Sequence, residues 1–185
     1  MNSHPAAVGI DSNTLSYLID ATSEAYDPFT DDALLATERL AMVRTFFYSK
    51  VLLWVPPTVA AEYCQIQDPD RFDSHWRTAQ YLLQDQPLKV EPAVIDARVN
   101  ELALHHPGRS DCRVVAEVEL AQLPVLLSCD LRLISRLRVR ARVDILRPSE
   151  LWKALEIPVT ANPLVEPATG HPLFDKTWWR FNDGA

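Results

Sequence analysis

Four acidic side chains stand where the chain leaves or approaches a predicted strand: Asp11, Glu62, Asp111 and Asp130. Asp11 and Asp130 come just after apolar runs. Asp111 stands in the first turn of a helix that leads into a strand, and Glu62 lies one turn into the helix after a strand. Ligands of parallel α/β sheets bind outside the carboxyl ends of the strands. We therefore expect these four carboxylates to converge on one edge of a sheet.

A cluster of carboxylates destabilises itself, because neighbouring negative charges raise one another's pKa. A hard divalent cation removes this repulsion. Mg²⁺ and Mn²⁺ prefer oxygen ligands, keep several waters and take only one or two carboxylates directly. Such a cation can activate a water for phosphodiester hydrolysis, while a second can stabilise the leaving oxygen. The pattern therefore predicts a metal-dependent phosphodiester hydrolase that uses Mg²⁺ or Mn²⁺.

Each carboxylate also has a purely structural explanation. An Asp after a strand often caps the following helix, which applies to Asp11 and to Asp130. Asp111 in a first helical turn complements the helix dipole, and a lone Glu62 on an apolar helix usually faces solvent. Independent caps need not fall on one edge of a sheet, so the combination favours a metal site.

Glycine is scarce in this chain of 185 residues. The four glycines are far apart, which excludes the loops G-x-x-x-x-G-K-[ST] and G-x-G-x-x-G. If the protein handles phosphates, it does so without a glycine loop, and a metal can take that role.

Short apolar runs alternate with helical patterns along the chain, which predicts an α/β fold with a mostly parallel sheet covered on both faces. Five strands are expected over 6–10, 51–54, 88–90, 125–128 and 143–146. Helices are expected over 12–21, 31–48, 58–66, 71–83, 92–104, 111–120, 131–138 and 148–155, and Ser110 can cap the sixth. The length favours one domain, over residues 1–156.

The segment 157–185 differs from this pattern, with four prolines followed by Trp178-Trp179 and Phe181. We expect a C-terminal extension that packs on the domain through an aromatic anchor.

Three cysteines without a C-x-x-C pair predict buried thiols in a reducing compartment. The N-terminus lacks the pattern of a signal peptide. The longest apolar stretch, 51–61, is interrupted by two prolines and is shorter than the roughly 20 residues that span a bilayer. We therefore expect a soluble, cytoplasmic protein with no membrane partner.

The carboxylates and their neighbours resemble the motifs of the PIN-domain family, which are metal-dependent nucleases related to the 5′-nuclease fold. Asp-Ser-Asn at 11–13 matches the Asp after the first strand, and Pro-Pro-Thr-Val-Ala-Ala-Glu-Tyr at 56–63 matches the helix after the second. Arg-Ser-Asp-Cys at 109–112 and Ser-Cys-Asp at 128–130 match the two later motifs. The resemblance covers roughly residues 6–155.

This resemblance implies a three-layer α/β/α sandwich with strand order 3-2-1-4-5. It implies cleavage of single-stranded RNA, with Asp11, Glu62, Asp111 and Asp130 arranging Mg²⁺ or Mn²⁺ and with Asn13 and Ser128 as their supports. Many single-domain members resemble VapC-type toxins, which a small antitoxin protein neutralises, and many dimerise. The proline- and tryptophan-rich segment 157–185 departs from those toxins.

Charge is unevenly distributed over a chain whose net charge is −7. Residues 98–147 carry nine arginines and six acids, a balance of +3, which leaves −10 for the rest. Arg113 and Arg132 lie next to two of the candidate aspartates and could contact a phosphate backbone, although arginines are also common on solvated surfaces. His105 and His106 precede a loop and are expected at the surface.

Other functions stay open. A non-catalytic RNA- or protein-binding module that keeps the PIN fold is the main alternative. A haloacid-dehalogenase-like site would need an Asp where Asn13 stands, and a receiver-like site would need a Lys near Arg147.

Overall fold

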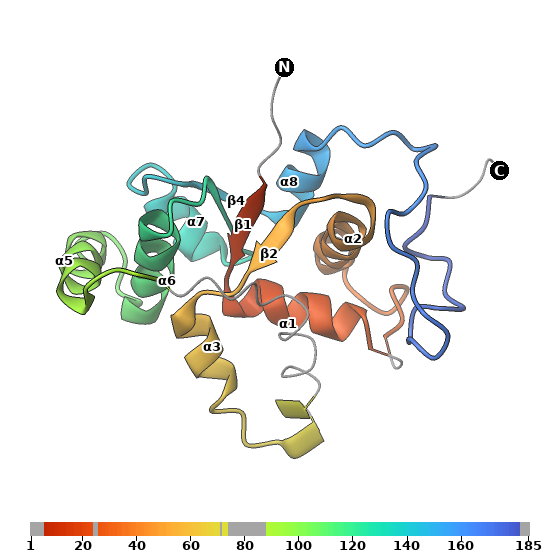
Figure 1. Cartoon of the computed structure of the whole chain (residues 1–185), viewed down its shortest axis with the longest axis horizontal. Helices are drawn as coiled ribbons and strands as arrows, with labels where there is room; N and C mark the ends of the chain where they lie inside the picture. Colours follow the sequence, from red (N-terminus) through yellow and green to blue (C-terminus); the bar gives the residue numbers. More distant parts are fainter. Residues whose placement is uncertain (1–5, 24–25, 71, 74–87, 182–185) are drawn as a thin grey trace.

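A four-stranded parallel sheet forms the centre of the protein (Figure 1). The computed structural model describes residues 6–23, 26–70, 72–73 and 88–181. The sheet has the order β2-β1-β3-β4, with β1 (Ala7–Ile10), β2 (Leu52–Trp54), β3 (Val125–Leu127) and β4 (Asp144–Leu146). Because the strands are parallel, their carboxyl ends all lie at one edge.

The expected fifth strand over 88–90 is wrong, since this segment has irregular backbone. A strand is stable only when a neighbour satisfies its backbone groups, and three residues with Lys89 in the middle offer little apolar area to hold one in place. The four remaining strands keep the order that the PIN resemblance implied. The α/β class and the parallel sheet are confirmed.

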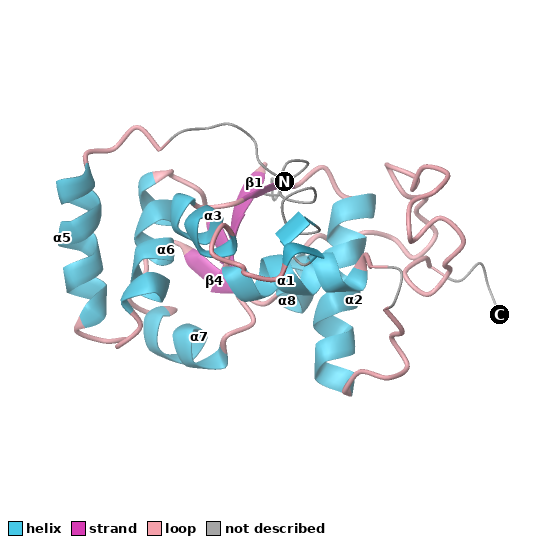
Figure 2. Ribbon diagram, turned by 90° about the horizontal axis from the view of Figure 1, so that it is seen from below, coloured by secondary structure: helices cyan, strands magenta, loops and turns pink. Residues whose placement is uncertain are grey.

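Helices cover both faces of the sheet. Figure 2 shows α1, α2 and α8 on one side of the strands and α5, α6 and α7 on the other, which is consistent with a three-layer sandwich. The described helices are α1 (Ser12–Ala21), α2 (Ala33–Tyr48), α3 (Pro57–Tyr63), α5 (Pro92–Ala103), α6 (Arg109–Leu120), α7 (Leu131–Leu137) and α8 (Pro148–Ala154). The helix expected over 71–83 lies almost entirely outside the described residues. No described helix is long and apolar enough to cross a membrane.

Capping residues and prolines explain where most of the helices begin. Asp11, Asp32 and Asp130 are N-caps whose carboxylates accept from backbone N–H groups of the first turn. Proline opens α3, α5 and α8, where its missing N–H costs nothing. The expected Ser110 cap is wrong: α6 begins at Arg109, two residues earlier than expected, its N-cap is Gly108, and Ser110 lies inside the helix.

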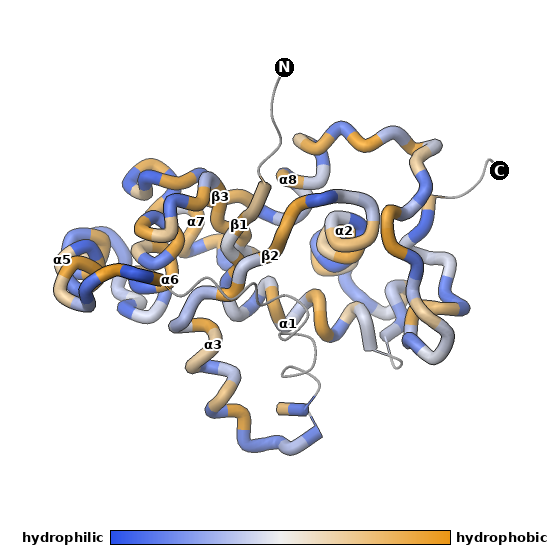
Figure 3. The backbone as a smooth tube through the Cα atoms, in the orientation of Figure 1, coloured by the Kyte–Doolittle hydropathy of each residue, from blue (hydrophilic) through white to orange (hydrophobic). Residues whose placement is uncertain are grey.

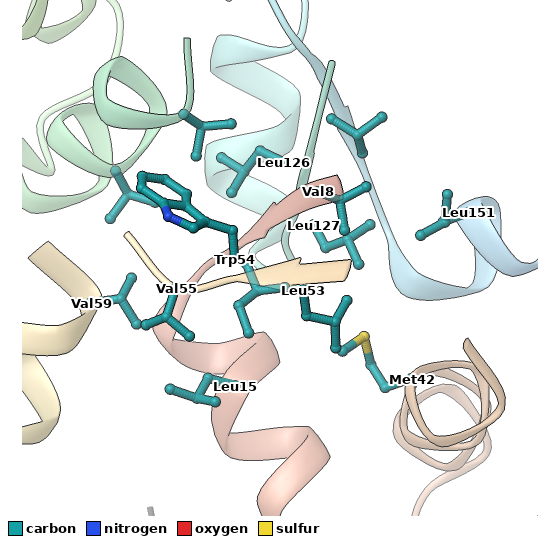
Figure 4. Packing of buried hydrophobic residues seen from close by; sticks show 14 of the residues in the cluster. Val8, Leu15, Met42, Leu53, Trp54, Val55, Val59, Leu126, Leu127 and Leu151 are labelled. Atoms are coloured by element: carbon teal, nitrogen blue, oxygen red, sulfur yellow. The ribbon is translucent and has the colours of Figure 1, made fainter. Parts of the chain in front are cut away.

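The core lies around β1 and β3, whose side chains are buried on both faces of the sheet. Val8, Leu126 and Leu127 pack with Leu53 and Met42 from neighbouring elements (Figure 4). Hydrophobic residues also follow β2 and much of α2 in Figure 3. This packing makes the central strands a rigid support for the residues at their ends.

Helix α6 packs directly on β1 through a glycine. A Cβ at Gly9 would lie 2.5 Å from Val118 Cγ2, so only glycine allows this close approach. Because α6 leads back into a parallel strand, its N-terminus lies at the carboxyl edge of the sheet. The contact therefore brings the head of α6, with Asp111, toward the end of β1.

The C-terminal segment packs on α2. Trp179 is completely buried, with its ring 4.7 Å from that of Phe47. Arg44 on α2 donates to the carbonyl oxygens of Trp179 and Arg180 at 2.9 and 3.1 Å. The amide of Leu164 also donates to the carbonyl of Phe47. An aromatic anchor thus holds this segment against the domain.

Candidate functional site

Asp11 lies at the carboxyl end of β1, beside β3. Its amide donates to the carbonyl of Leu127 at 3.1 Å, and its carboxylate accepts from the Thr14 amide at 2.7 Å as the cap of α1. The residue is only 7% exposed. Burial raises the pKa of the Asp11 carboxyl, hydrogen bonds from Ser128 and Thr14 oppose this rise, and the negative charge of Asp111 adds to it.

Glu62 connects the two segments that carry Asp11 and Asp111. One of its oxygens accepts a hydrogen bond from the hydroxyl of Ser12, and the other accepts one from the hydroxyl of Ser110. Ser12 directly follows Asp11, and Ser110 directly precedes Asp111. Three carboxylates from β1, α3 and α6 thus come to the same edge of the sheet.

The position of Glu62 depends on a buried carboxylate that sequence reasoning missed. Glu117 on α6 is 3% exposed and accepts from the amide and the hydroxyl of Thr58, at 3.0 and 2.7 Å. Burial raises the pKa of the Glu117 carboxyl, which the two hydrogen bonds from Thr58 oppose. These bonds fix the start of α3 on α6. A Glu within the apolar run 114–118 was the available signal.

Asp111 binds a histidine. The side-chain atoms His106 Nε2 and Asp111 Oδ2 lie 2.7 Å apart, and His106 is only 5% exposed. The expectation of a surface histidine at this position is therefore wrong, whereas His105 is exposed. A loop position before a helix gave no sign that the chain would fold the ring inward.

Asp130 is the least connected of the four candidates. Its Oδ1 accepts from the amides of Arg132 and Leu133 at 2.7 and 3.1 Å, so it caps α7. Among the described residues, no hydrogen bond or ion pair joins it to the other three carboxylates. The buried Ser128 hydroxyl accepts from the Asp130 amide at 3.0 Å and also interacts with Asp11, so Ser128 links the ends of β1 and β3.

The other predicted residues differ in their surroundings. Asn13 is exposed on α1. Arg113 forms an ion pair with Asp96 on α5. Arg132 is exposed, and its guanidinium has no hydrogen-bond or ion-pair partner in the described part of the chain. Of the two predicted phosphate contacts, Arg132 is therefore the one free to bind an anion.

A recess of about 140 Å³ opens beside the end of β3. Its walls include Tyr17, Glu38, Cys129, Leu131 and Arg147. Burial, together with the charges of Asp11 and Glu38, raises the pKa of the Cys129 thiol to about 12. Cys129 thus lines the recess directly before Asp130 in the chain, and its thiol is protonated at neutral pH.

The donors at this edge are carboxylate and hydroxyl oxygens, which suit a hard cation such as Mg²⁺ or Mn²⁺. Within the described residues, no three His, Cys, Asp or Glu side chains are grouped closely enough to hold a metal together. Mg²⁺ usually needs only one or two protein carboxylates and completes its shell with water. The oxygen donors therefore fit Mg²⁺ or Mn²⁺, even though protein side chains would not fill the whole coordination shell of the ion.

No protein-family model matches the sequence, and a search of curated proteins finds no significant match.

Proposed function

We propose that this protein is a Mg²⁺- or Mn²⁺-dependent endoribonuclease of the PIN type. The observation that carries the proposal is the bridge formed by Glu62, which accepts from Ser12 and Ser110 and so brings Asp11 and Asp111 to one edge of the sheet. That edge is where ligands of parallel α/β sheets bind. The choice of single-stranded RNA as substrate comes from the sequence resemblance.

In this proposal, one or two of the carboxylates of Asp11, Glu62 and Asp111 would bind the cation directly, and the others, with Asp130 at the end of β3, would act through its waters. When bound, such a cation would supply the nucleophile for phosphodiester hydrolysis by lowering the pKa of a coordinated water. Burial of Asp11 gives its charge a strong preference for a cation, because no ion-pair partner is found for it among the described residues. The free guanidinium of Arg132 binds a substrate phosphate.

The decisive experiment is cleavage of single-stranded RNA with Mn²⁺ or Mg²⁺ by the wild type, Asp11→Asn and Asp111→Asn. Mutation of a residue that hydrogen-bonds to a metal ligand typically lowers metal affinity or activity roughly 10–100-fold. Loss of a ligand itself should therefore reduce the cleavage rate by at least about 100-fold. The matched control is Asp144→Asn, since Asp144 is exposed at the opposite end of the strands, in β4. It should cleave like the wild type.

Metal-dependent cleavage that survives both substitutions would overturn the proposal. A wild type that binds RNA but never cleaves it would favour the non-catalytic module instead. The helix-capping roles of Asp11 and Asp130 are the observation that favours this second function, because capping alone can account for these two side chains.

A further inference from the structure

The imidazole of His106 approaches Asp111 from inside the protein. Its Nε2 lies 2.7 Å from Asp111 Oδ2, and the His106 side chain is 6% exposed whereas that of Asp111 is 41% exposed. An ionised carboxylate can only accept hydrogen bonds, so Nε2 is the donor. The histidine therefore holds one oxygen of Asp111 and leaves the other to a ligand on the solvent side.

The loop between α5 and α6 is built around this hydrogen bond. A Cβ at Gly108 would lie 2.2 Å from Asp111 Oδ2 and 2.8 Å from His106 Nε2, so a larger residue would separate the pair. The His106 amide donates to the carbonyl of Leu102, and the Cys112 thiol donates to the His106 carbonyl at 3.5 Å. Both bonds hold the backbone of His106, which limits how far the ring can move from Asp111.

The second ring nitrogen excludes a direct chemical role for the histidine. His106 Nδ1 is buried and has no hydrogen-bond partner in the described part of the chain. A general base must reach the proton that it removes, but Nδ1 is buried and Nε2 is already hydrogen-bonded to Asp111. The contribution of His106 to a reaction must therefore pass through Asp111.

We propose that His106 is a positioning residue, which fixes the Asp111 carboxylate for metal binding through its Nε2–H. This inference rests on the proposed function of Asp111. Outer hydrogen-bond partners orient metal ligands and typically change metal affinity 10–100-fold. Gly108 contributes to this positioning, because the absence of a side chain leaves room for the hydrogen bond between His106 and Asp111.

The test measures Mn²⁺ binding directly and, separately, the Mn²⁺ concentration that gives half-maximal RNA cleavage. His106→Leu should raise both about 10–100-fold. His106→Gln should recover much of this loss, because its amide N–H can take the place of Nε2–H. Gly108→Ala should behave like His106→Leu, and His105→Leu, at the exposed neighbour, should match the wild type.

Thermal unfolding of the same variants distinguishes an effect on the position of Asp111 from a general loss of stability. A variant that is folded but needs more Mn²⁺ supports the inference. Unchanged Mn²⁺ dependence in His106→Leu, or a loss of stability alone that glutamine does not reverse, would overturn it while leaving the proposed nuclease intact. Failure of the wild type to bind Mn²⁺ would overturn both. If His106→Leu does not fold, the comparison of His106→Gln with the wild type and Gly108→Ala decides the question in the same way.

Discussion

The Ser110 hydroxyl on α6 donates a hydrogen bond to the Glu62 carboxylate on α3, although 48 positions separate the two residues. The second oxygen of Glu62 accepts from Ser12, 50 positions away. Since these serines adjoin Asp111 and Asp11, Glu62 connects two aspartates that are distant in sequence. Variants around this connection can separate structural from functional roles of the carboxylates.

Glu62→Gln should abolish metal-dependent RNA cleavage, with a loss of at least about 100-fold, because it removes a ligand charge. Stability should change little, within about 0.5 kcal/mol, since the residue is only half-buried and glutamine still accepts from one serine. Cleavage rates and thermal unfolding check the two parts. Glu91→Gln, at an exposed position before α5, is the control; equal cleavage by both variants would contradict the prediction.

Asp11→Asn should stabilise the protein at pH 7 while it inactivates the site. Burial raises the folded-state pKa of Asp11, so the folded state loses stability as the pH rises from about 4, the unfolded value, through the higher folded value. Asparagine keeps the cap of α1 without the buried charge. Each kcal/mol relieved should raise Tm by roughly 2–4 °C.

Thermal unfolding of wild type and Asp11→Asn between pH 3 and pH 8 checks this prediction. The gain in Tm should be full above the folded pKa and should shrink toward zero below about pH 4. A variant that is less stable than the wild type at pH 7 would show that the ionised carboxylate is stabilised by the fold.

Mn²⁺ should raise the Tm of the metal-free wild type. A ligand that binds only the folded state stabilises it by about 2.7 kcal/mol at a concentration of 100 times its Kd. EDTA should reverse the shift, and the double variant Asp11→Asn/Asp111→Asn should lose it. An equal shift in the double variant would place the bound metal elsewhere on the protein.

Arg132→Ala should weaken binding of single-stranded RNA and reduce the salt dependence of binding by about one unit of slope. Arg113→Ala should have a smaller effect, because the Arg113 guanidinium is already paired with Asp96. Binding titrations at several salt concentrations, with an inactive Asp111→Asn background, measure both. A larger effect at Arg113 would reverse this assignment.

Trp179→Ala should destabilise the protein by about 3–5 kcal/mol, the range for large aromatic side chains removed from a core. Trp179 is fully buried against Phe47 and Tyr48. Phe174→Ala, at a 44% exposed aromatic of the same segment, should cost much less. Urea unfolding provides the measurement, and similar losses for both variants would mean that Trp179 is not the anchor.

Local sequence patterns predicted the secondary structure of this fold well. The alternation of apolar runs and amphipathic segments placed every described helix within a few residues, because periodicity and caps act over neighbouring positions. The segment 88–90 shows where this reasoning fails. Its short apolar pattern resembled that of β2, which pairs with β1, whereas 88–90 pairs with none of the described strands.

The residue types at the strand ends were likewise evident from the sequence, and the parallel order explains why Asp11 and Asp130 share an edge with the head of α6. Their partners were not evident. Ser110 looked like a cap and His106 like a surface residue, but they bind Glu62 and Asp111. The partner of Ser110 depends on which elements pack together, and that packing is set by contacts between segments far apart in the sequence, such as Gly9 with Val118. His106 and Asp111 are only five positions apart, but the conformation of their loop decides that the ring turns inward.

Local periodicity and residue type were therefore enough to predict the class of fold and the carboxylates available for chemistry. Which carboxylates meet, which one is buried and which arginine is free depended instead on how distant elements pack. Docking of α3 against α1 and α6 lets two serines hold Glu62, and burial at the end of β1 raises the pKa of Asp11.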